Sequence, residues 1–433
     1  MHHFRYLGGK LFCEDVAVAA LAEKYGTPLY VYSQQTLTDH FQKLDTALAP
    51  VAHQICFAMK ANSNQSVMRA LANLGSGFDV VSAGELQRVI AAGGDPRKCV
   101  FAGVAKTADE IAFALRQGIY SFNCESEPEI QRLNQVAARL KKVAPIAVRV
   151  NPDVEAHTHV KITTGTYENK FGIALEHVAG VYARAAKLKH IRLRGFQMHI
   201  GSQLTDVAPY EQAVTKVLPL VQELKARHHL EFFSPGGGLG IIYNPALASG
   251  AAAWWRSPAA QGLLTPASYA ATLLPLLQSL GLKILLEPGR FIVGNAGLLV
   301  TRVEYVKHTG HKHFVIVDAA MNDLIRPAFY DSYHEIVPLT KKSGALVSSD
   351  VVGGICESGD FFCKDRPLPK VGEGDRLALM SAGAYGFVMA SNYNTRPLAA
   401  EILVHGKRVA VVRARQPVTA IWAGEQVAPW LRK

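Results

Sequence analysis

Short β-rich runs alternate with segments of helical apolar spacing between residues 54 and 287, and this repetition constrains the fold more than any other feature. The runs are Gln54–Met59, Gly77–Val81, Lys98–Gly103, Ile119–Asn123, Ile146–Asn151, Leu193–Ile200, Leu230–Ser234 and Lys283–Glu287. The helical segments, which begin near Ser, Thr or Pro, include Ala83–Ala92, Thr107–Gln117, Glu127–Lys141 and Tyr210–His228. Eight strands that alternate with helices predict an α/β fold, a (β/α)8 barrel of the TIM type.

Beyond Arg290 the pattern changes to extended runs separated by Gly, Pro and Asp turns. The runs are Ala296–Lys307, His313–Asp318, Gly344–Val352, Asp375–Met380, Glu401–His405 and Lys407–Val412. They predict a second, mainly β barrel domain. We expect an N-terminal segment at 1–30 that contributes to the β domain, the (β/α)8 barrel at 31–289 and the β domain at 290–433. Within these parts we expect a hairpin at Tyr6–Leu11 and a long loop at Ala246–Thr265.

The composition excludes several classes of protein. The chain has 433 residues, 49% of them hydrophobic, and a formal net charge of +11 that forms no block, which favours a small anionic ligand over nucleic acid. Six cysteines without a Cys-x-x-Cys pair favour a reducing compartment, with Cys56 and Cys99 as buried thiols. The N-terminus lacks a signal core and no apolar stretch approaches the ~20 residues that cross a bilayer, so we expect a cytoplasmic protein without a membrane partner.

Polar residues stand at the carboxyl ends of the predicted barrel strands, where barrel enzymes build their active sites. They include Lys60, Asp79, Arg149, Asn151, His199 and Glu287. Lys60 follows the apolar run that ends at Met59. Partial burial would disfavour its ammonium and allow Schiff-base chemistry with an aldehyde cofactor. The alternative is a solvated lysine that caps the strand.

A glycine-rich stretch follows the seventh predicted strand and contains Gly236, Gly237 and Gly238. Glycine permits close approach and positive φ, so several backbone N–H groups can face a phosphate there. Barrels frequently hold phosphate after this strand. The alternative is a flexible turn.

Glu287 follows an apolar strand, where an ionised carboxylate is costly unless it is paired. A pyridinium nitrogen is a suitable partner, because a carboxylate keeps that ring protonated and electron-withdrawing. A salt bridge with Arg290 is the alternative. His199, at the end of the sixth strand, is either a structural hydrogen-bonding group or a ring that stacks on a flat cofactor.

Motifs distributed over nearly the whole chain resemble the fold-type III pyridoxal phosphate-dependent decarboxylases, the ornithine, diaminopimelate and arginine decarboxylase group. Within it the nearest resemblance is to the diaminopimelate decarboxylases. The motifs are Tyr25–Tyr32, Ala58–Asn62, His199–Gln203, Gly236–Gly240, Glu287–Arg290, Cys356–Asp360, Tyr385-Gly386 and Tyr393–Pro397. Two stretches depart from the family pattern: Ser234-Pro235 stands where an acidic or amide residue and an apolar one are commoner, and Ala246–Thr265 has no counterpart that we recognise.

The resemblance implies pyridoxal 5'-phosphate as the cofactor and no metal. Lys60 would carry the cofactor as a Schiff base, His199 would pack on the ring and Glu287 would face the pyridine nitrogen. The phosphate would be held by Ser202, Gly236, Gly237, Gly238, Gly289, Arg290 and Tyr385. The substrate would be bound by Arg290, Arg326, Tyr330, Glu357 and Tyr385. Cys356 would supply a proton or guide the reaction across the interface of a homodimer.

The resemblance also implies the reaction, decarboxylation of meso-2,6-diaminopimelate to L-lysine and carbon dioxide in lysine biosynthesis. One alternative is a related decarboxylase that acts on a D-amino acid or a carrier-linked amino acid. Another is a non-catalytic regulator that binds pyridoxal phosphate. Local sequence leaves two roles open: Cys356 either takes part in the reaction or only packs, and Arg326, which precedes Pro327, either binds the substrate or is a surface arginine.

Overall fold

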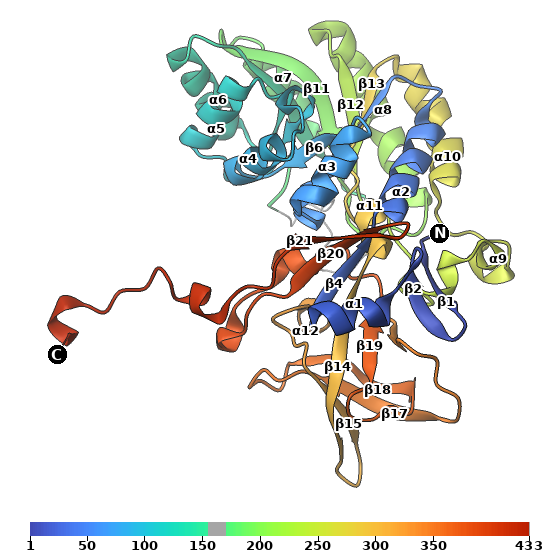
Figure 1. The fold of residues 1–433 in the computed structure, drawn as a ribbon. Coiled ribbons are helices and arrows are strands. Elements are labelled where there is room, and N and C mark those ends of the chain that lie inside the picture. Colours follow the sequence, from blue (N-terminus) through green and yellow to red (C-terminus); the bar gives the residue numbers. More distant parts are fainter. Residues whose placement is uncertain (155–169, 433) are drawn as a thin grey trace. The chain divides into compact units, whose positions relative to one another are not determined.

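The computed structural model describes residues 1–154 and 170–432, which form two compact units (Figure 1). The barrel unit comprises Thr36–Ile241 and Trp255–Gly294. The β unit comprises Met1–Gln35, Ile242–Trp254 and Asn295–Lys433. The predicted division at residues 30 and 289 stays a proposal for the domain boundaries, and the compact units differ from it because Ile242–Trp254 belongs to the β unit.

A closed ring of eight parallel strands forms the core of the barrel unit in the described part of the chain. The strands are β5 (His53–Ala58), β6 (Gly77–Val80), β7 (Val100–Phe101), β8 (Ser121–Cys124), β9 (Ala144–Asn151), β11 (Ile191–Met198), β12 (Phe232–Gly236) and β13 (Lys283–Leu286). The ring closes because β13 pairs with β5 and β8 pairs with β9. A short strand, β10 (Ile173–Ala174), also pairs with β9. Each predicted strand is present, and the predicted fold class is confirmed.

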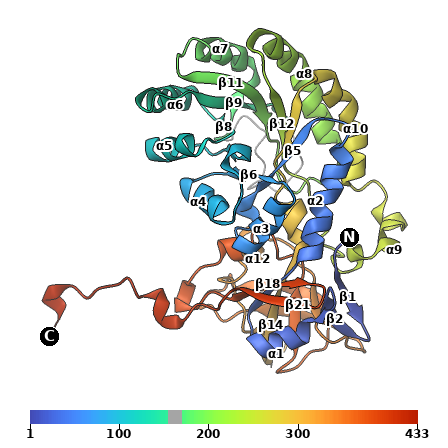
Figure 2. The ribbon, with the colours of Figure 1, turned by 45° about the horizontal axis from the view of Figure 1, so that its top comes forward.

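Helices surround this ring and connect its strands (Figure 2). They are α2 (Gln34–Leu48), α3 (Gln65–Asn73), α4 (Ala83–Ala91), α5 (Ala108–Gln117), α6 (Glu127–Arg139), α7 (Leu175–Ala185), α8 (Ala208–His228), α10 (Pro266–Leu280) and α11 (Arg290–Val293). Side-chain caps define several of their starts: Ser82 and Ser126 cap α4 and α6, and Thr107 forms a capping box with Glu110 on α5. The strand ends are therefore joined to helices at well-defined positions.

The β unit is built on a large, mostly antiparallel sheet with the order β18-β17-β15-β14-β4-β20-β21. Its strands are β4 (Leu29–Ser33), β14 (Gly297–His308), β15 (His313–Val317), β16 (Ile336–Pro338), β17 (Leu346–Val352), β18 (Phe361–Pro369), β19 (Arg376–Leu379), β20 (Ala400–His405) and β21 (Arg408–Arg413). β4 lies between β14 and β20, and it is antiparallel to the first and parallel to the second. A strand from the N-terminal region thus occupies the middle of this sheet.

Smaller elements complete the β unit. The expected hairpin forms from β1 (Phe4–Leu7) and β2 (Lys10–Cys13), and β3 (Val16–Ala17) extends it to three strands. Helices α1 (Val18–Tyr25) and α12 (Arg326–Tyr330) also belong to this unit. The segment predicted as the loop Ala246–Thr265 contains three short helical turns, η4 (Ala248–Gly250), α9 (Ala252–Trp255) and η5 (Pro258–Ala260).

Four strands of the β unit were not predicted: β3, β4, β16 and β18. β18 contains Pro367 and Pro369, which cannot donate backbone hydrogen bonds and so weaken the strand signal in the sequence. It is a strand all the same because it lies at one edge of the sheet and pairs on one side with β17. β16 has three residues, too few for a pattern of alternation to be read.

Among the helices at 1–154 and 170–432, none has the length and hydropathy needed to span a bilayer.

Candidate active site

Lys60 and Asp79 form an ion pair at the carboxyl ends of neighbouring barrel strands. Lys60 lies in the single turn Met59–Ala61 directly after β5, and Asp79 lies opposite Ala58 in the register of β5 and β6. The Lys60 Nζ is 2.7 Å from the Asp79 Oδ2, and Asp79 is buried while the Lys60 side chain is 43% exposed. The lysine is thus held at the mouth of the barrel by a buried carboxylate and is not a simple solvated cap.

Glu287 is buried directly after β13, and three neutral side chains donate hydrogen bonds to its carboxylate. Asn123 Nδ2 and Ser234 Oγ donate to Oε1 at 3.1 and 3.0 Å. Gln197 Nε2 donates to Oε2 at 2.9 Å. These donors come from β8, β12 and β11, so three strands fix the orientation of this carboxylate.

The environment of Glu287 shifts its carboxyl toward the protonated form. Burial and the negative charge of Asp79 raise the pKa of Glu287 to about 7, although Lys60 and the hydrogen bonds from Ser234 and Gln197 act in the opposite direction. A cation placed against this carboxylate would therefore be stabilised strongly by it. A pyridinium ring is such a cation.

His199 directly follows β11 and is kept neutral. The Gly237 N–H donates to its Nδ1 at 3.3 Å, so this nitrogen carries no proton. Desolvation and the positive charges of Arg149 and Lys60 hold the pKa of His199 well below its ordinary value. A neutral imidazole is suited to lie against a flat aromatic ring without competing with Glu287 for positive charge.

Packing requires three consecutive glycines, the last residue of β12 and the two residues that follow it. A Cβ on Gly237 would lie 2.0 Å from the backbone oxygen of Glu287, and one on Gly236 would lie 2.4 Å from that of Met198. Gly238 has φ +102° and would place a Cβ 2.4 Å from the Gly201 oxygen. The backbone of this segment is thus pressed against two neighbouring strand ends, which is the close approach that a phosphate cradle needs.

The donor and acceptor set of the site fits pyridoxal phosphate. Three buried oxygens, Asp79 Oδ1, Asn123 Oδ1 and Gln197 Oε1, accept no hydrogen bond from the described residues. Each belongs to a side chain that contacts Lys60 or Glu287. The arrangement combines a reactive amine, a carboxylate suited to a ring cation, a neutral imidazole and a glycine cradle at one end of the barrel.

Comparison with known proteins identifies the family. Residues 34–294 match the family model of the pyridoxal-dependent decarboxylases, pyridoxal binding domain. Diaminopimelate decarboxylase from Vibrio cholerae is 49% identical over 432 residues, which cover 99% of this chain and 100% of the relative. The chain belongs to the diaminopimelate decarboxylase family of pyridoxal-dependent decarboxylases. Pyridoxal phosphate is accordingly its cofactor.

Solved diaminopimelate decarboxylase structures show the same fold. The Helicobacter pylori enzyme complexed with L-lysine has a TM-score of 0.87 and 38% identity, covering 94% of this chain and 98% of that one. The M. jannaschii enzyme, also in complex with L-lysine, has a TM-score of 0.91 and 34% identity with full coverage of both chains. The whole length of this chain therefore corresponds to the family.

The β unit carries the remaining predicted site residues, and Arg326 is buried within it. Its Nε donates to His334 Nε2 at 3.3 Å and its Nη2 donates to Ser332 Oγ at 3.1 Å. The guanidinium also lies 5.5 and 5.9 Å from the ring centroids of Tyr243 and Tyr330. The alternative interpretation of Arg326 as a surface residue is therefore wrong.

Cys356 is exposed in the single chain, whereas the other five cysteines are buried. The Cys356 N–H donates to Asn394 Oδ1 at 3.0 Å. Asp360 accepts hydrogen bonds from the Ile355 and Met321 N–H groups, each at 2.7 Å, and so joins the Cys356 loop to the segment that precedes Arg326. Glu357, also exposed, contacts Tyr393.

In the barrel unit the structure brings together most of the predicted cofactor residues. They are Lys60, His199, Ser202, Gly236, Gly237, Gly238, Glu287, Gly289 and Arg290. Arg290 Nη2 donates to Ser202 Oγ at 3.2 Å. The residues Arg326, Tyr330, Cys356, Glu357 and Tyr385 belong to the β unit. The roles of both sets remain predictions.

Sequence reasoning missed Asn123, Gln197 and Ser234 as site residues. Asn123 and Gln197 are polar positions near the carboxyl ends of their strands, a signal that was present in the sequence. Ser234 was noted as a departure from the family pattern, and its hydroxyl proves to hold Glu287. Asp79 was noted as a strand end without a role, and the structure pairs it with Lys60.

We predict that Gly237→Ala will lower the affinity for pyridoxal phosphate at least ~tenfold, because the added Cβ must displace the Glu287 backbone. Gly372→Ala is the matched control, since a Cβ at Gly372 meets nothing within 4 Å. Titration of the cofactor-free proteins, followed by visible absorbance, measures the effect. Equal affinities of the two variants would contradict the packing argument.

We predict that Glu287→Gln will stabilise the cofactor-free protein at pH 8 and have little effect at pH 5. The folded-state pKa of about 7 exceeds the ordinary value of 4.5, so the wild type loses stability as the pH rises from about 4.5 to about 7, where the unfolded chain has released this proton and the folded chain still holds it. At ~1.4 kcal/mol per pKa unit the gain is about 3 kcal/mol, or several degrees in Tm. Thermal denaturation at both pH values provides the measurement. If the Tm of Glu287→Gln differs from that of the wild type by the same amount at both pH values, the result would be inconsistent with a raised pKa of Glu287.

Proposed function

We propose that this chain decarboxylates meso-2,6-diaminopimelate to L-lysine and carbon dioxide with pyridoxal phosphate. The proposal is carried by two groups at the carboxyl ends of the barrel strands. One is the Lys60 amine, which is paired with Asp79, and the other is the Glu287 carboxylate, which accepts hydrogen bonds from three neutral side chains. Relatives that are 49% identical over nearly the full chain bear the name of this enzyme, which supports the same substrate here.

The catalytic roles follow from the surroundings of each group. Bound pyridoxal phosphate supplies an aldehyde that joins an amine and a ring that withdraws electrons from the bond to the α-carboxylate. Lys60 is the amine that holds the cofactor, and Asp79 stabilises a proton on its Nζ at 2.7 Å. Glu287 stabilises positive charge on the pyridine nitrogen, because three donors fix its oxygens in place. His199 packs on the ring as a neutral imidazole.

The phosphate is assigned to the glycine segment after β12 and to the residues around it. Gly236, Gly237 and Gly238 supply backbone, with Gly289 from the turn after β13. Ser202 and Arg290, which contact each other at 3.2 Å, supply a hydroxyl and a guanidinium. Tyr385 of the β unit is proposed as a further phosphate and substrate ligand.

Specificity for a substrate with two carboxylates is assigned to Arg326. Its guanidinium is buried and contacts His334, Ser332 and two tyrosine rings. Lysine or ornithine lacks the distal carboxylate that such a guanidinium would bind. Arg290 and Tyr330 complete the carboxylate contacts, and Glu357 binds the distal amino group.

We further propose a homodimer with active sites at the subunit interface, in which the exposed Cys356 protonates the substrate carbon or guides that step.

Cytoplasmic localisation is supported by the six cysteines, all of which are free thiols.

We predict that Arg326→Ala will lower kcat/KM for diaminopimelate about 10- to 100-fold, the value of one charged hydrogen bond of ~1.5–3 kcal/mol. Arg302→Ala, which removes an exposed arginine of β14, should change it less than about twofold. Release of carbon dioxide from diaminopimelate, lysine and ornithine is measured for each variant. Greater activity of the wild type on lysine than on diaminopimelate would refute the substrate assignment.

The covalent assignment is tested in the same preparation. Borohydride reduction should fix the cofactor to the peptide that contains Lys60, as read by mass spectrometry. A modified lysine elsewhere in the chain would refute the site.

We predict that mixing inactive Lys60→Ala and Cys356→Ala chains will restore about a quarter of wild-type activity. Half of the randomly mixed dimers are hybrids, and each hybrid has one intact site if the two residues come from different subunits. Mixing Lys60→Ala with Glu287→Gln is the control and should restore none, because both residues belong to the barrel unit. Absence of recovery in the first mixture would count against a shared site.

A further inference from the structure

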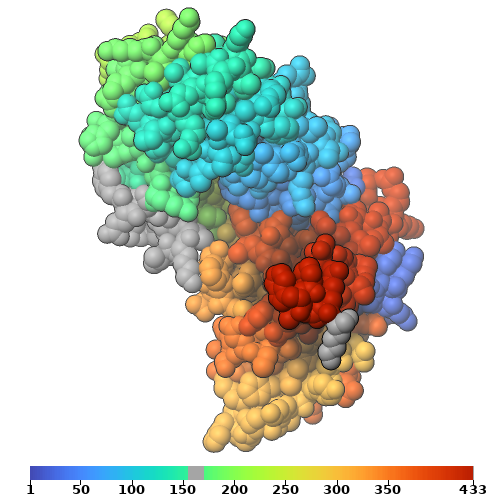
Figure 3. Space-filling model, turned by 90° about the vertical axis from the view of Figure 1, so that its left-hand side faces the viewer, coloured from blue at the N-terminus to red at the C-terminus, as the bar shows by residue number. Residues whose placement is uncertain are grey.

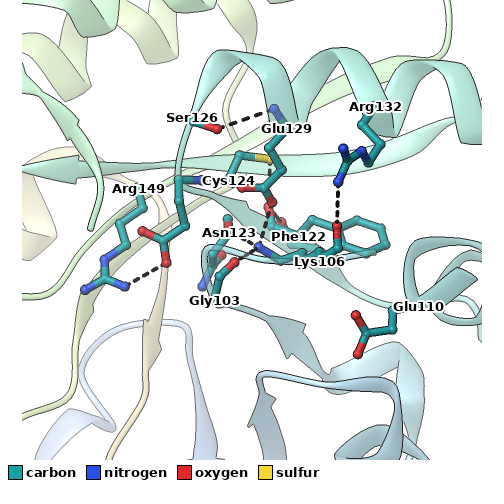
Figure 4. Close-up of polar contacts among 12 residues, drawn as sticks. Gly103, Lys106, Glu110, Phe122, Asn123, Cys124, Ser126, Glu129, Arg132 and Arg149 are labelled. Atoms are coloured by element: carbon teal, nitrogen blue, oxygen red, sulfur yellow. Dashed lines mark hydrogen bonds and ion pairs between the residues drawn. The ribbon is translucent and has the colours of Figure 1, made fainter. Parts of the chain in front are cut away.

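A buried lysine outside the proposed catalytic set lies among the loops that follow the barrel strands. Lys106, between β7 and α5, is 3% exposed. Its Nζ donates to Gly103 O at 2.6 Å, to Asn123 O at 2.9 Å and to Glu129 Oε1 at 2.6 Å (Figure 4). All three acceptors are supplied by the protein, so the charge of Lys106 is satisfied within the fold.

Glu129, the partner of Lys106, lies in the first turn of α6 and is also buried. Its second oxygen, Oε2, accepts the Glu125 N–H at 2.9 Å. Burial raises the pKa of Glu129, and the neighbouring charge of Lys106 opposes that rise. The ion pair therefore holds two residues at the same time: Lys106 binds the backbone oxygen of Asn123, and Glu129 binds the backbone N–H of Glu125.

The segment held in this way, Asn123–Glu125, leads to two charged groups of the site. The Asn123 side chain donates to Glu287 Oε1 at 3.1 Å. Glu125 Oε1 accepts from Arg149 Nη1 at 2.8 Å, and Arg149 is a positive charge that lowers the pKa of His199. One side of the segment thus contacts the carboxylate proposed for the pyridine nitrogen, and the other contacts the arginine beside the ring-packing histidine.

We propose that the Lys106–Glu129 ion pair is a positioning element that fixes Asn123–Glu125 and thereby the orientations of Glu287 and Arg149 toward the cofactor. The proposal rests on the site assignment made under Proposed function. Each link is a contact of 3.1 Å or less between buried residues. Neither Lys106 nor Glu129 touches the cofactor in this scheme, and both act through the segment.

An ion pair at this position is explained better by positioning than by stability. Burying two charges costs desolvation energy that their attraction repays only when the geometry is excellent, and apolar pairs are often as stable. What an apolar pair cannot provide is a donor to Asn123 O together with an acceptor for the Glu125 N–H. The same helix offers a contrast, because the Glu127–Arg184 pair is exposed and neither residue contacts Asn123–Glu125 in the described structure.

The test compares Glu129→Gln with Glu127→Gln, which make the same chemical change two residues apart on α6. Affinity for pyridoxal phosphate, the visible spectrum of the bound cofactor between pH 6 and 9, kcat, KM and Tm are measured for both. Glu129→Gln should weaken cofactor binding about tenfold, alter the pH dependence of the spectrum and lower kcat with little change in KM, since small misplacements of a catalytic group are costly. Glu127→Gln should match the wild type.

A second variant removes the risk of an unpaired buried charge. Lys106→Met with Glu129→Met eliminates both charges and should show the same cofactor and spectral defects while remaining folded. A lowered Tm with wild-type cofactor affinity and spectrum, in either variant, would mean a structural role only and would overturn the proposal. Failure of the wild type itself to bind pyridoxal phosphate would overturn the proposed function and the positioning role together. If the wild type binds the cofactor and neither variant differs from it in cofactor affinity or spectrum, the positioning role alone is overturned.

Discussion

The burial of Glu287 among neutral donors is the interaction on which the site depends. A carboxylate in this position is costly to ionise, and Asn123, Gln197 and Ser234 orient it by hydrogen bonds while the charge of Lys60 favours its ionised form. A positively charged group of a ligand would favour the ionised form further. The barrel supplies this arrangement because each of three strands, β8, β11 and β12, contributes one donor to the same carboxylate.

Much of the architecture follows from the sequence because the barrel repeats one simple unit. Each barrel strand was recognisable as an apolar run, and each polar residue at a strand end was a candidate for the site. The partners of Glu287 were harder to find. Asn123 and Gln197 lie inside their strands, and the direction of a side chain in a closed ring depends on register and shear, which an individual sequence does not display.

The β unit was less readable for physical reasons of a different kind. β18 contains prolines that are tolerated because of its edge position, and edge positions are known only once the order of strands is known. The burial of Arg326 likewise depends on His334, Ser332 and Tyr243, the last of which comes from a segment about eighty residues earlier. The resemblance to a family named Arg326 but not its partners, and local sequence could not place them.

The central position of β4 has a consequence for biosynthesis. All eight barrel strands have left the ribosome once residue 286 is free, so that ring can close early. β4, at Leu29–Ser33, must wait for β14 and finally for β20 at Ala400–His405 before both of its edges are covered. For most of translation it is an exposed strand edge of the sort that chaperones protect, and a chain released before residue 400 would have a closed barrel and an incomplete sheet.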